Sequence, residues 1–224
     1  MGDFLFDARF FKSYNSRMSK FLKILKWAGI VLIVLFVVAE LIRWPFRVRE
    51  EKTAELVVKI HNTKLTLDDV MGKNLPLDPG AEADKTIAGI DANTNGIRDD
   101  VELAIFEAYP NSAKTRAVLL QYALAMQMIF TQPIENKKTT AEVVREESRS
   151  YACVGDGLVP RKSPESSRSD DEISIIDSFI NFIESKQLNT QERIEYRKNF
   201  FEKIGSFSES TNSICDIDLS TLPN

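Results

Sequence analysis

The chain has 224 residues, and the 175 from Glu50 onward are enough for one domain with a real hydrophobic core. It carries 33 Asp and Glu against 29 Lys and Arg, and it has no basic patch outside the flanks of its apolar N-terminal segment, which disfavours nucleic-acid binding. With one histidine and two cysteines, no zinc ligand set can be assembled, and any Ser–His–Asp triad would depend on that single histidine.

The first predicted element is an apolar segment near the N-terminus. Residues Leu22–Ile42 extend for about 31 Å as a helix, long enough to cross a bilayer if the few charged side chains reach the interfaces. Trp27 and Trp44 lie where an aromatic belt would place them, and Pro45 is expected to break the helix. We therefore expect a cytoplasmic segment, residues 1–21, and a transmembrane signal anchor, residues 22–44.

Charge and cysteine usage indicate the compartment. Six Lys and Arg precede Trp27, where the uncharged part of the apolar segment begins, and five closely follow Ile42, but from Glu50 onward 30 acidic residues outnumber 20 basic ones. Together with two cysteines in the larger part, this favours a single-pass protein of the bacterial inner membrane with its C-terminal domain in the periplasm. The alternative is a signal peptide cleaved near Ala39, which would release a secreted or periplasmic protein.

A stalk or linker is expected over residues 45–80. Residues 51–65 predict a stalk helix or a short hairpin, in which His61 is expected to be solvated or packed on a helix. Thr66 then has the pattern of an N-cap for a short helix that ends at Gly72. A proline-bearing linker, residues 74–80, follows.

One stretch of the sequence has the pattern of a metal-binding loop. Residues 91–102 read D-A-N-T-N-G-I-R-D-D-V-E and match the EF-hand calcium loop D-x-[DN]-x-[DN]-G-x5-E at every constrained position. Ca²⁺ binds six to eight oxygen atoms, and Gly96 would allow the sharp turn that brings a backbone carbonyl into the shell. The expected ligands of one Ca²⁺ are Asp91, Asn93, Asn95, the carbonyl of Ile97, Asp99 and Glu102.

Two departures narrow the class of calcium protein. The eighth loop position, usually an aliphatic residue that pairs with a second EF-hand, is Arg98, and no second loop is present in the chain. The loop and its following helix resemble the single calcium loops of dockerin-like and uncharacterised bacterial exported proteins. That resemblance implies one ion, and the ligand charge indicates a dissociation constant of roughly 10⁻⁴–10⁻³ M.

The rest of residues 81–224 predicts a mainly α domain with no β-rich stretch. Met126 and Met128 are expected in its core, and Gly155 and Gly157 in a loop. The predicted elements are a helix from the calcium loop to Pro110, one from Asn111 or Ser112 through Thr131, one from Thr139 or Thr140 to about Val154, a mobile loop over 156–171, a helix with an apolar stripe from Ile173 to Ile183, a last helix opening at Thr190, and an irregular tail over 206–224.

Cys153 and Cys215 are expected to form a disulfide. The bond would close a loop of about sixty residues, worth roughly 4 kcal/mol on the chain-entropy model. Two independent buried thiols are the alternative.

No catalytic residue can be assigned. Adjacent carboxylates such as Glu146 and Glu147 fit an acidic surface, because neighbouring helical residues do not share a face. The sequence therefore favours a non-enzymatic, membrane-anchored calcium-binding protein with a structural ion and a binding or scaffold role, in which the partner is a protein of the cell envelope. Two alternatives stand beside it: a calcium-responsive interaction module, and a carboxylate-dependent envelope hydrolase.

Overall fold

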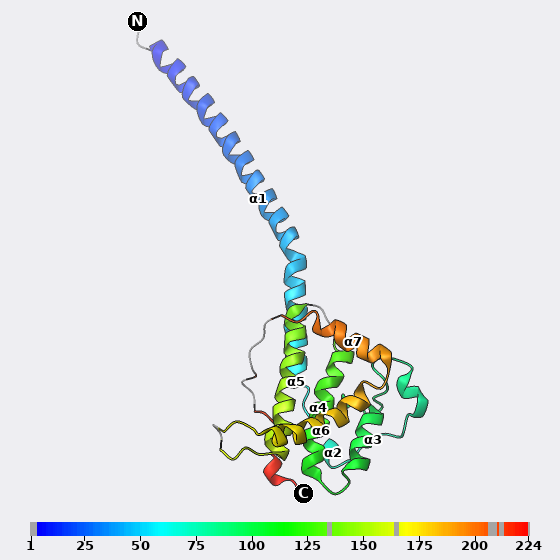
Figure 1. Cartoon of the computed structure of the whole chain (residues 1–224). Helices are drawn as coiled ribbons and strands as arrows, with labels where there is room; N and C mark the ends of the chain where they lie inside the picture. The colour runs from blue at the N-terminus through cyan, green and yellow to red at the C-terminus, as the bar shows by residue number, and fades with distance from the viewer. Residues whose placement is uncertain (1–3, 134–135, 164–165, 206–209, 211–212, 224) are drawn as a thin grey trace. The chain divides into compact units, whose positions relative to one another are not determined.

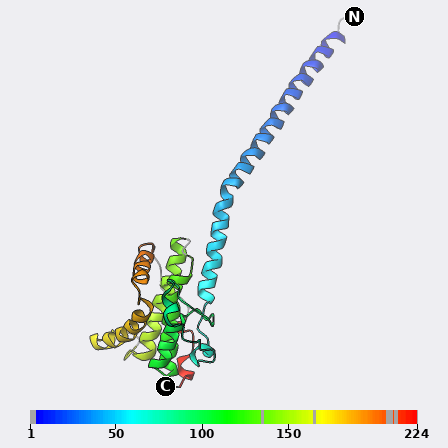
Figure 2. The same cartoon turned by 90° about the vertical axis from the view of Figure 1, so that its right-hand side faces the viewer.

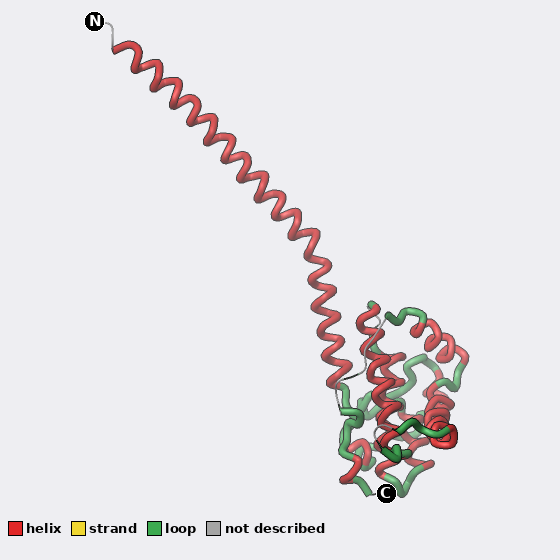
Figure 3. The backbone as a smooth tube through the Cα atoms, turned by 60° about the vertical axis from the view of Figure 1, so that its left-hand side comes forward, coloured by secondary structure: helices red, strands yellow, loops and turns green. Residues whose placement is uncertain are grey.

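A computed structural model describes residues 4–133, 136–163, 166–205, 210 and 213–223. This part of the chain is built from helices and loops and contains no strand, as Figure 3 shows, so the mainly α prediction is confirmed for it. The chain divides into two compact units, Met1–Lys52 and Thr53–Asn224. Parts of the predicted loop 156–171 and of the predicted tail lie outside the described residues.

The long helix α1 covers Phe4–Asn62. Its portion Lys20–Asn62 is long and apolar enough to cross a membrane, and no other helix in the described chain meets that test. The expected break at Pro45 is wrong, because α1 continues through this residue. A proline removes one backbone hydrogen bond and costs about 3 kcal/mol in a helix interior, yet apolar membrane helices tolerate it where neighbouring groups satisfy the freed carbonyl.

The segment after α1 belongs to the C-terminal unit. A short helix, α2 (Leu67–Val70), starts at Thr66 with the predicted capping box. Gly72 follows with φ +67°, a left-handed conformation that suits glycine. Because Ile60, Leu65 and Val70 are all buried in the core, the chain from Thr53 onward packs with the domain and is more than a linker.

Helix α4 (Ala113–Thr131) forms the centre of the C-terminal unit. It is capped by Ser112, as predicted, and is buried along nearly its whole length, with Met126 and Met128 in the core. Helix α5 (Lys137–Leu158) runs beside it, α6 (Asp170–Gln187) lies against both, and α7 (Gln191–Phe201) lies against α4 (Figures 1 and 2). The remaining elements are η1 (Gly80–Asp84), α3 (Asp99–Ala108) and η2 (Leu219–Thr221).

Helix α5 starts earlier than the sequence indicates. Its N-cap is Asn136, whose side-chain oxygen accepts from the backbone N–H groups of Lys138 and Thr139. Thr139 and Thr140, the predicted caps, therefore lie inside the first turn. Asparagine is an equally good cap, and it stands three residues further upstream.

The same helix also ends later than expected, at Leu158. Gly155 and Gly157 are helical, so the predicted loop there is wrong. A Cβ atom at Gly157 would lie 2.7 Å from Leu219 and 3.0 Å from Val118. This glycine is needed for the close approach of the C-terminal tail and α4 to α5.

The last two helices are present as predicted, but α6 begins at Asp170, inside the segment predicted as a mobile loop. Ser169 caps α6 and Thr190 caps α7. Ile176, Ile180 and Ile183 form the buried stripe of α6. The predicted disulfide between Cys153 and Cys215 is confirmed, with a Cα–Cα distance of 5.1 Å, and it fastens the C-terminal tail to α5.

Candidate metal centre

The loop of residues 91–102 leads directly into α3, and Glu102 lies on the first turn of that helix, as the motif requires. Gly96 has φ +86°, and a Cβ atom there would lie 2.7 Å from a methyl group of Leu124. The backbone conformation therefore favours glycine, and any other residue would also displace the Leu124 methyl group. Thr94 has φ +58°, and it is the only described residue other than glycine with positive φ. Strain of this kind often marks functional loops, and no sequence pattern indicated it.

Two aspartates hold the loop in its folded form. The carboxylate oxygens of Asp91 accept from the backbone N–H groups of Asn95 (3.1 Å) and Gly96 (2.9 Å). Both oxygens of Asp99 accept from the N–H of Ala92, at 3.0 and 3.2 Å. Asp99 is almost completely buried, and that burial raises the pKa of its carboxyl.

The Glu102 carboxylate accepts hydrogen bonds from two of the predicted ligands, Asn93 and Asn95. The side-chain Nδ2 atoms of Asn93 and Asn95 donate to its two carboxylate oxygens at 3.0 and 3.1 Å. Glu102 is only 1% exposed, and this burial raises the pKa of its carboxyl to about 7 despite both hydrogen bonds. An isolated buried carboxylate is costly, so this position favours either a proton or a bound cation.

The structure does not gather all the expected ligands. Among the residues described, no three His, Cys, Asp or Glu side chains lie close enough together to hold a metal ion. Glu102 meets the two asparagines, whereas Asp91 and Asp99 are bonded to backbone groups. Ile97 is fully buried, and its N–H donates to Oδ1 of Asn95 at 2.9 Å.

The chemistry of the donor set nevertheless fits Ca²⁺. Its side chains offer three carboxylates and two amides, all sources of the hard oxygen ligands that this ion prefers. Rotation of an asparagine side-chain amide by 180° exchanges its oxygen and nitrogen, so Asn93 and Asn95 can direct oxygen where they now direct N–H. A divalent ion would also offset the burial of Asp99 and Glu102.

Arg98 takes a role that the motif does not predict. Its side chain is fully buried and pairs with Asp100 through two hydrogen bonds, at 2.5 and 2.8 Å. It also donates to the backbone carbonyls of Lys186 (2.6 Å) and Gln187 (3.3 Å), at the end of α6. The arginine thus satisfies carbonyl groups that a helix terminus leaves without partners, and it joins the loop to α6.

The chain just before the loop is joined to α7 in the same way. The fully buried Arg193 donates to the carbonyls of Ala83, Thr86 and Ile87 and pairs with Asp84 at 2.6 Å. The loop and the segment that leads into it are therefore fixed to the corner between α6 and α7.

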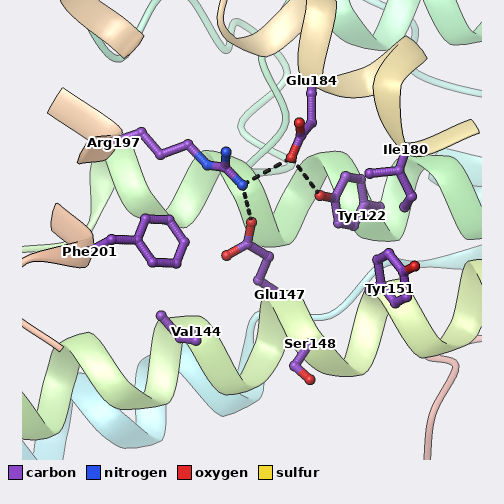
Figure 4. A pocket seen from close by; sticks show the side chains of 9 residues that line it. All are labelled: Tyr122, Val144, Glu147, Ser148, Tyr151, Ile180, Glu184, Arg197 and Phe201. Atoms are coloured by element: carbon purple, nitrogen blue, oxygen red, sulfur yellow. Dashed lines mark hydrogen bonds and ion pairs between the residues drawn. The ribbon is translucent and has the colours of Figure 1, made fainter. Parts of the chain in front are cut away.

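A second polar cluster lies in a pocket of about 310 Å³ formed by α4, α5, α6 and α7 (Figure 4). There, one Nη2 atom of Arg197 lies 3.0 Å from Glu147 and 2.9 Å from Glu184, and the Tyr122 hydroxyl donates to the same Glu184 oxygen. Burial raises the pKa of the Glu147 carboxyl, and the ion pair with Arg197 opposes that effect. Because the one guanidinium group contacts a carboxylate on α5 and another on α6, we interpret the cluster as a tie between α7 and its neighbours.

The expectation that Glu146 and Glu147 form an acidic surface is wrong, because both are buried. Their side chains reach different partners: Glu147 contacts Arg197, whereas Glu146 contacts Arg149 and His61. The Glu146–Arg149 spacing of three residues was the available signal, since such pairs meet on one helix face.

Comparison with known proteins returned no match: no family model, no curated protein and no solved structure matches this chain.

Proposed function

We propose that this chain is a membrane-anchored, extracytoplasmic protein that binds one structural Ca²⁺ in the loop of residues 91–102. The observation that carries the proposal is the buried Glu102 carboxylate, which faces the side chains of Asn93 and Asn95 inside a loop with the complete motif. Nothing positively charged contacts Glu102 among the described residues, so a cation would supply the missing compensation.

A structural role for the ion is supported by how firmly the loop is attached. Gly96 packs against Leu124 of the central helix, and Arg98 is bonded to the end of α6. An ion that stabilises such a loop would stabilise the domain core with it. This favours a scaffold or binding protein of the cell envelope, with a single membrane span and a protein partner in the envelope.

Calorimetric titration of the full-length chain in detergent micelles tests the ion directly. We expect one Ca²⁺ per chain and little heat from Mg²⁺, which demands a smaller octahedral shell and releases its water reluctantly. Loss of binding in Glu102→Gln, with retention in Glu107→Gln, would assign the ion to the loop, because Glu107 is exposed on the same helix. If neither ion produces heat in the titration, the proposal that the chain binds Ca²⁺ is wrong.

The proposed location rests on the long apolar helix, the disulfide and the acidic composition after the span. Reporter fusions at the two ends should place the N-terminus in the cytoplasm and the C-terminus in the periplasm. Sequencing of the mature N-terminus distinguishes the anchor from the cleaved alternative, because a chain that begins near Glu40 would be a released protein.

The bonds from Arg98 to the end of α6 also favour the second candidate, a calcium-responsive interaction module. In that case the ion would order the corner between α6 and α7 and so alter a surface that a partner contacts. Hydrogen exchange over residues 184–193 separates the two roles: a structural ion slows exchange across the whole domain, whereas a switch slows it mainly at this corner.

A further inference from the structure

The last turns of α1 are held to the domain by few buried groups. Of residues 53–62, only Thr53 and Ile60 are buried. At one end, the Thr53 hydroxyl oxygen accepts from the Asn136 side chain at 2.6 Å. At the other end stands His61, next to Ile60. Because apolar burial here is small, polar contacts must contribute much of the attachment.

His61, the single histidine of the chain, contacts two carboxylates of α5 at once. Its Nδ1 atom lies 3.0 Å from Glu146, and its Nε2 atom lies 3.0 Å from Glu142. An ionised carboxylate only accepts hydrogen bonds, and a neutral imidazole has only one N–H group. Both contacts are therefore hydrogen bonds only when the ring carries both protons. In the neutral ring, one nitrogen lone pair would face a carboxylate oxygen.

The surrounding charges are otherwise balanced. On α5, Arg145 pairs with Glu142 and Arg149 pairs with Glu146. From the C-terminal tail, Asp216 pairs with Arg149 at 2.9 Å and with Lys64 at 3.1 Å. Three cations thus face three carboxylates without counting the histidine.

The two contacts of His61 are not equivalent. The Glu142 oxygen that faces the ring is shared with Arg145, and it keeps that partner if the ring is neutral. The Glu146 oxygen that faces the ring has no other partner in the described part of the chain, and Glu146 is 1% exposed. A neutral ring would therefore keep its N–H toward Glu146 and lose the bond to Glu142.

We propose that His61 is a pH-sensitive latch between the end of α1 and α5, closed when the ring is protonated and loosened when it is neutral. Histidine is the side chain that ordinarily changes charge between about pH 5 and 8. The direction follows from the geometry: the protonated ring makes two bonds in the folded chain, so the attachment is strongest in acid and weakens as pH rises. A latch of this kind would let envelope acidity control how firmly the domain holds the helix that carries the proposed anchor.

Hydrogen exchange of the full-length chain in detergent micelles tests the latch. After correction for the intrinsic pH dependence of exchange, amides of residues 55–62 should exchange roughly tenfold faster at pH 8 than at pH 6, because one charge-assisted bond is lost. Amides of the buried α4 serve as the internal reference and should show no such difference. Equal corrected rates over 55–62 at the two pH values would overturn the proposal.

Two variants separate a latch from a merely structural histidine. In His61→Gln the side chain does not titrate, so the difference between pH 6 and pH 8 should disappear. In Glu142→Gln the new amide can donate to the bare nitrogen of a neutral ring, so residues 55–62 should stay protected at pH 8. If Glu142→Gln loosens at pH 8 as the wild type does, or if His61→Gln keeps the pH difference, His61 is not the switch.

Discussion

Replacement of Glu102 by glutamine should stabilise the calcium-free protein and yet abolish its response to calcium. In the folded chain the pKa of this carboxyl rises from 4.5 to about 7, because the group is buried. The folded state therefore binds more protons than the unfolded state between these two values. It follows that the stability of the ion-free protein falls as pH rises through this window and is constant above it.

The magnitude follows from the size of this change. At pH 8, keeping Glu102 ionised in the ion-free fold costs about 3 kcal/mol relative to the unfolded chain, at 1.36 kcal/mol per factor of ten in the equilibrium constant. Glutamine removes that cost, but its one side-chain oxygen can accept from only one of Asn93 and Asn95, so one hydrogen bond is lost, a cost of about 1–2 kcal/mol. The net gain in chelator is about 1–2 kcal/mol, or roughly 2–8 °C in melting temperature.

Calcium should reverse the order of the two proteins. A hundredfold excess of ion over the dissociation constant stabilises the wild type by about 2.7 kcal/mol, whereas Glu102→Gln has lost its anionic ligand. The assay is thermal unfolding of the full-length chain in micelles at pH 8, with chelator and with calcium, and Glu107→Gln is the matched control. If Glu102→Gln melts below the wild type in chelator, the argument from burial fails, and if calcium stabilises both equally, Glu102 is not a ligand.

Three further perturbations test the fold around the site. Gly96→Ala should destabilise the protein by about 2–4 kcal/mol in denaturant titrations, because its Cβ would meet Leu124 and its φ is +86°; full stability would show that the turn is not as tight as described. Replacement of both Cys153 and Cys215 by serine should cost about 4 kcal/mol, and recovery of unlinked peptides from a non-reduced digest of the wild type would contradict the bond. Arg197→Met should lower the free energy of unfolding by about 2–4 kcal/mol in chemical denaturation, since it leaves Glu147 and Glu184 without their cation. An unchanged denaturation midpoint would show that Arg197 does not hold α7 to its neighbours.

Local signals in the sequence were sufficient for most helices of the domain. Ser112 and Thr190, both predicted caps, begin α4 and α7 in the structure, whereas Ser169, the cap of α6, lies in the segment predicted as a mobile loop. Periodicity then identified which face of α6 is buried. The errors arose where tertiary contacts override local preference, as at Gly157, which lies within α5 where Leu219 and Val118 pack too closely for a Cβ atom.

The candidate site was predictable as a list of residues but not as an arrangement. The motif placed Glu102 on the first turn of a helix and brought Asn93 and Asn95 to it. The motif could not show that Arg98 donates to backbone carbonyls at the end of α6, because Arg98 and Lys186 are 88 residues apart in the chain. For the same reason, sequence patterns could not predict the two carboxylates around His61, which are 81 and 85 residues away in the chain.

The most direct test of the central claim is the melting temperature of the full-length protein in millimolar calcium and in chelator, at pH 7.5. At tenfold excess of calcium over its dissociation constant, we expect a stabilisation of about 1.4 kcal/mol, or roughly 3–6 °C, and little effect from magnesium. Equal melting temperatures in calcium and in chelator would mean that residues 91–102 form a turn that binds no ion.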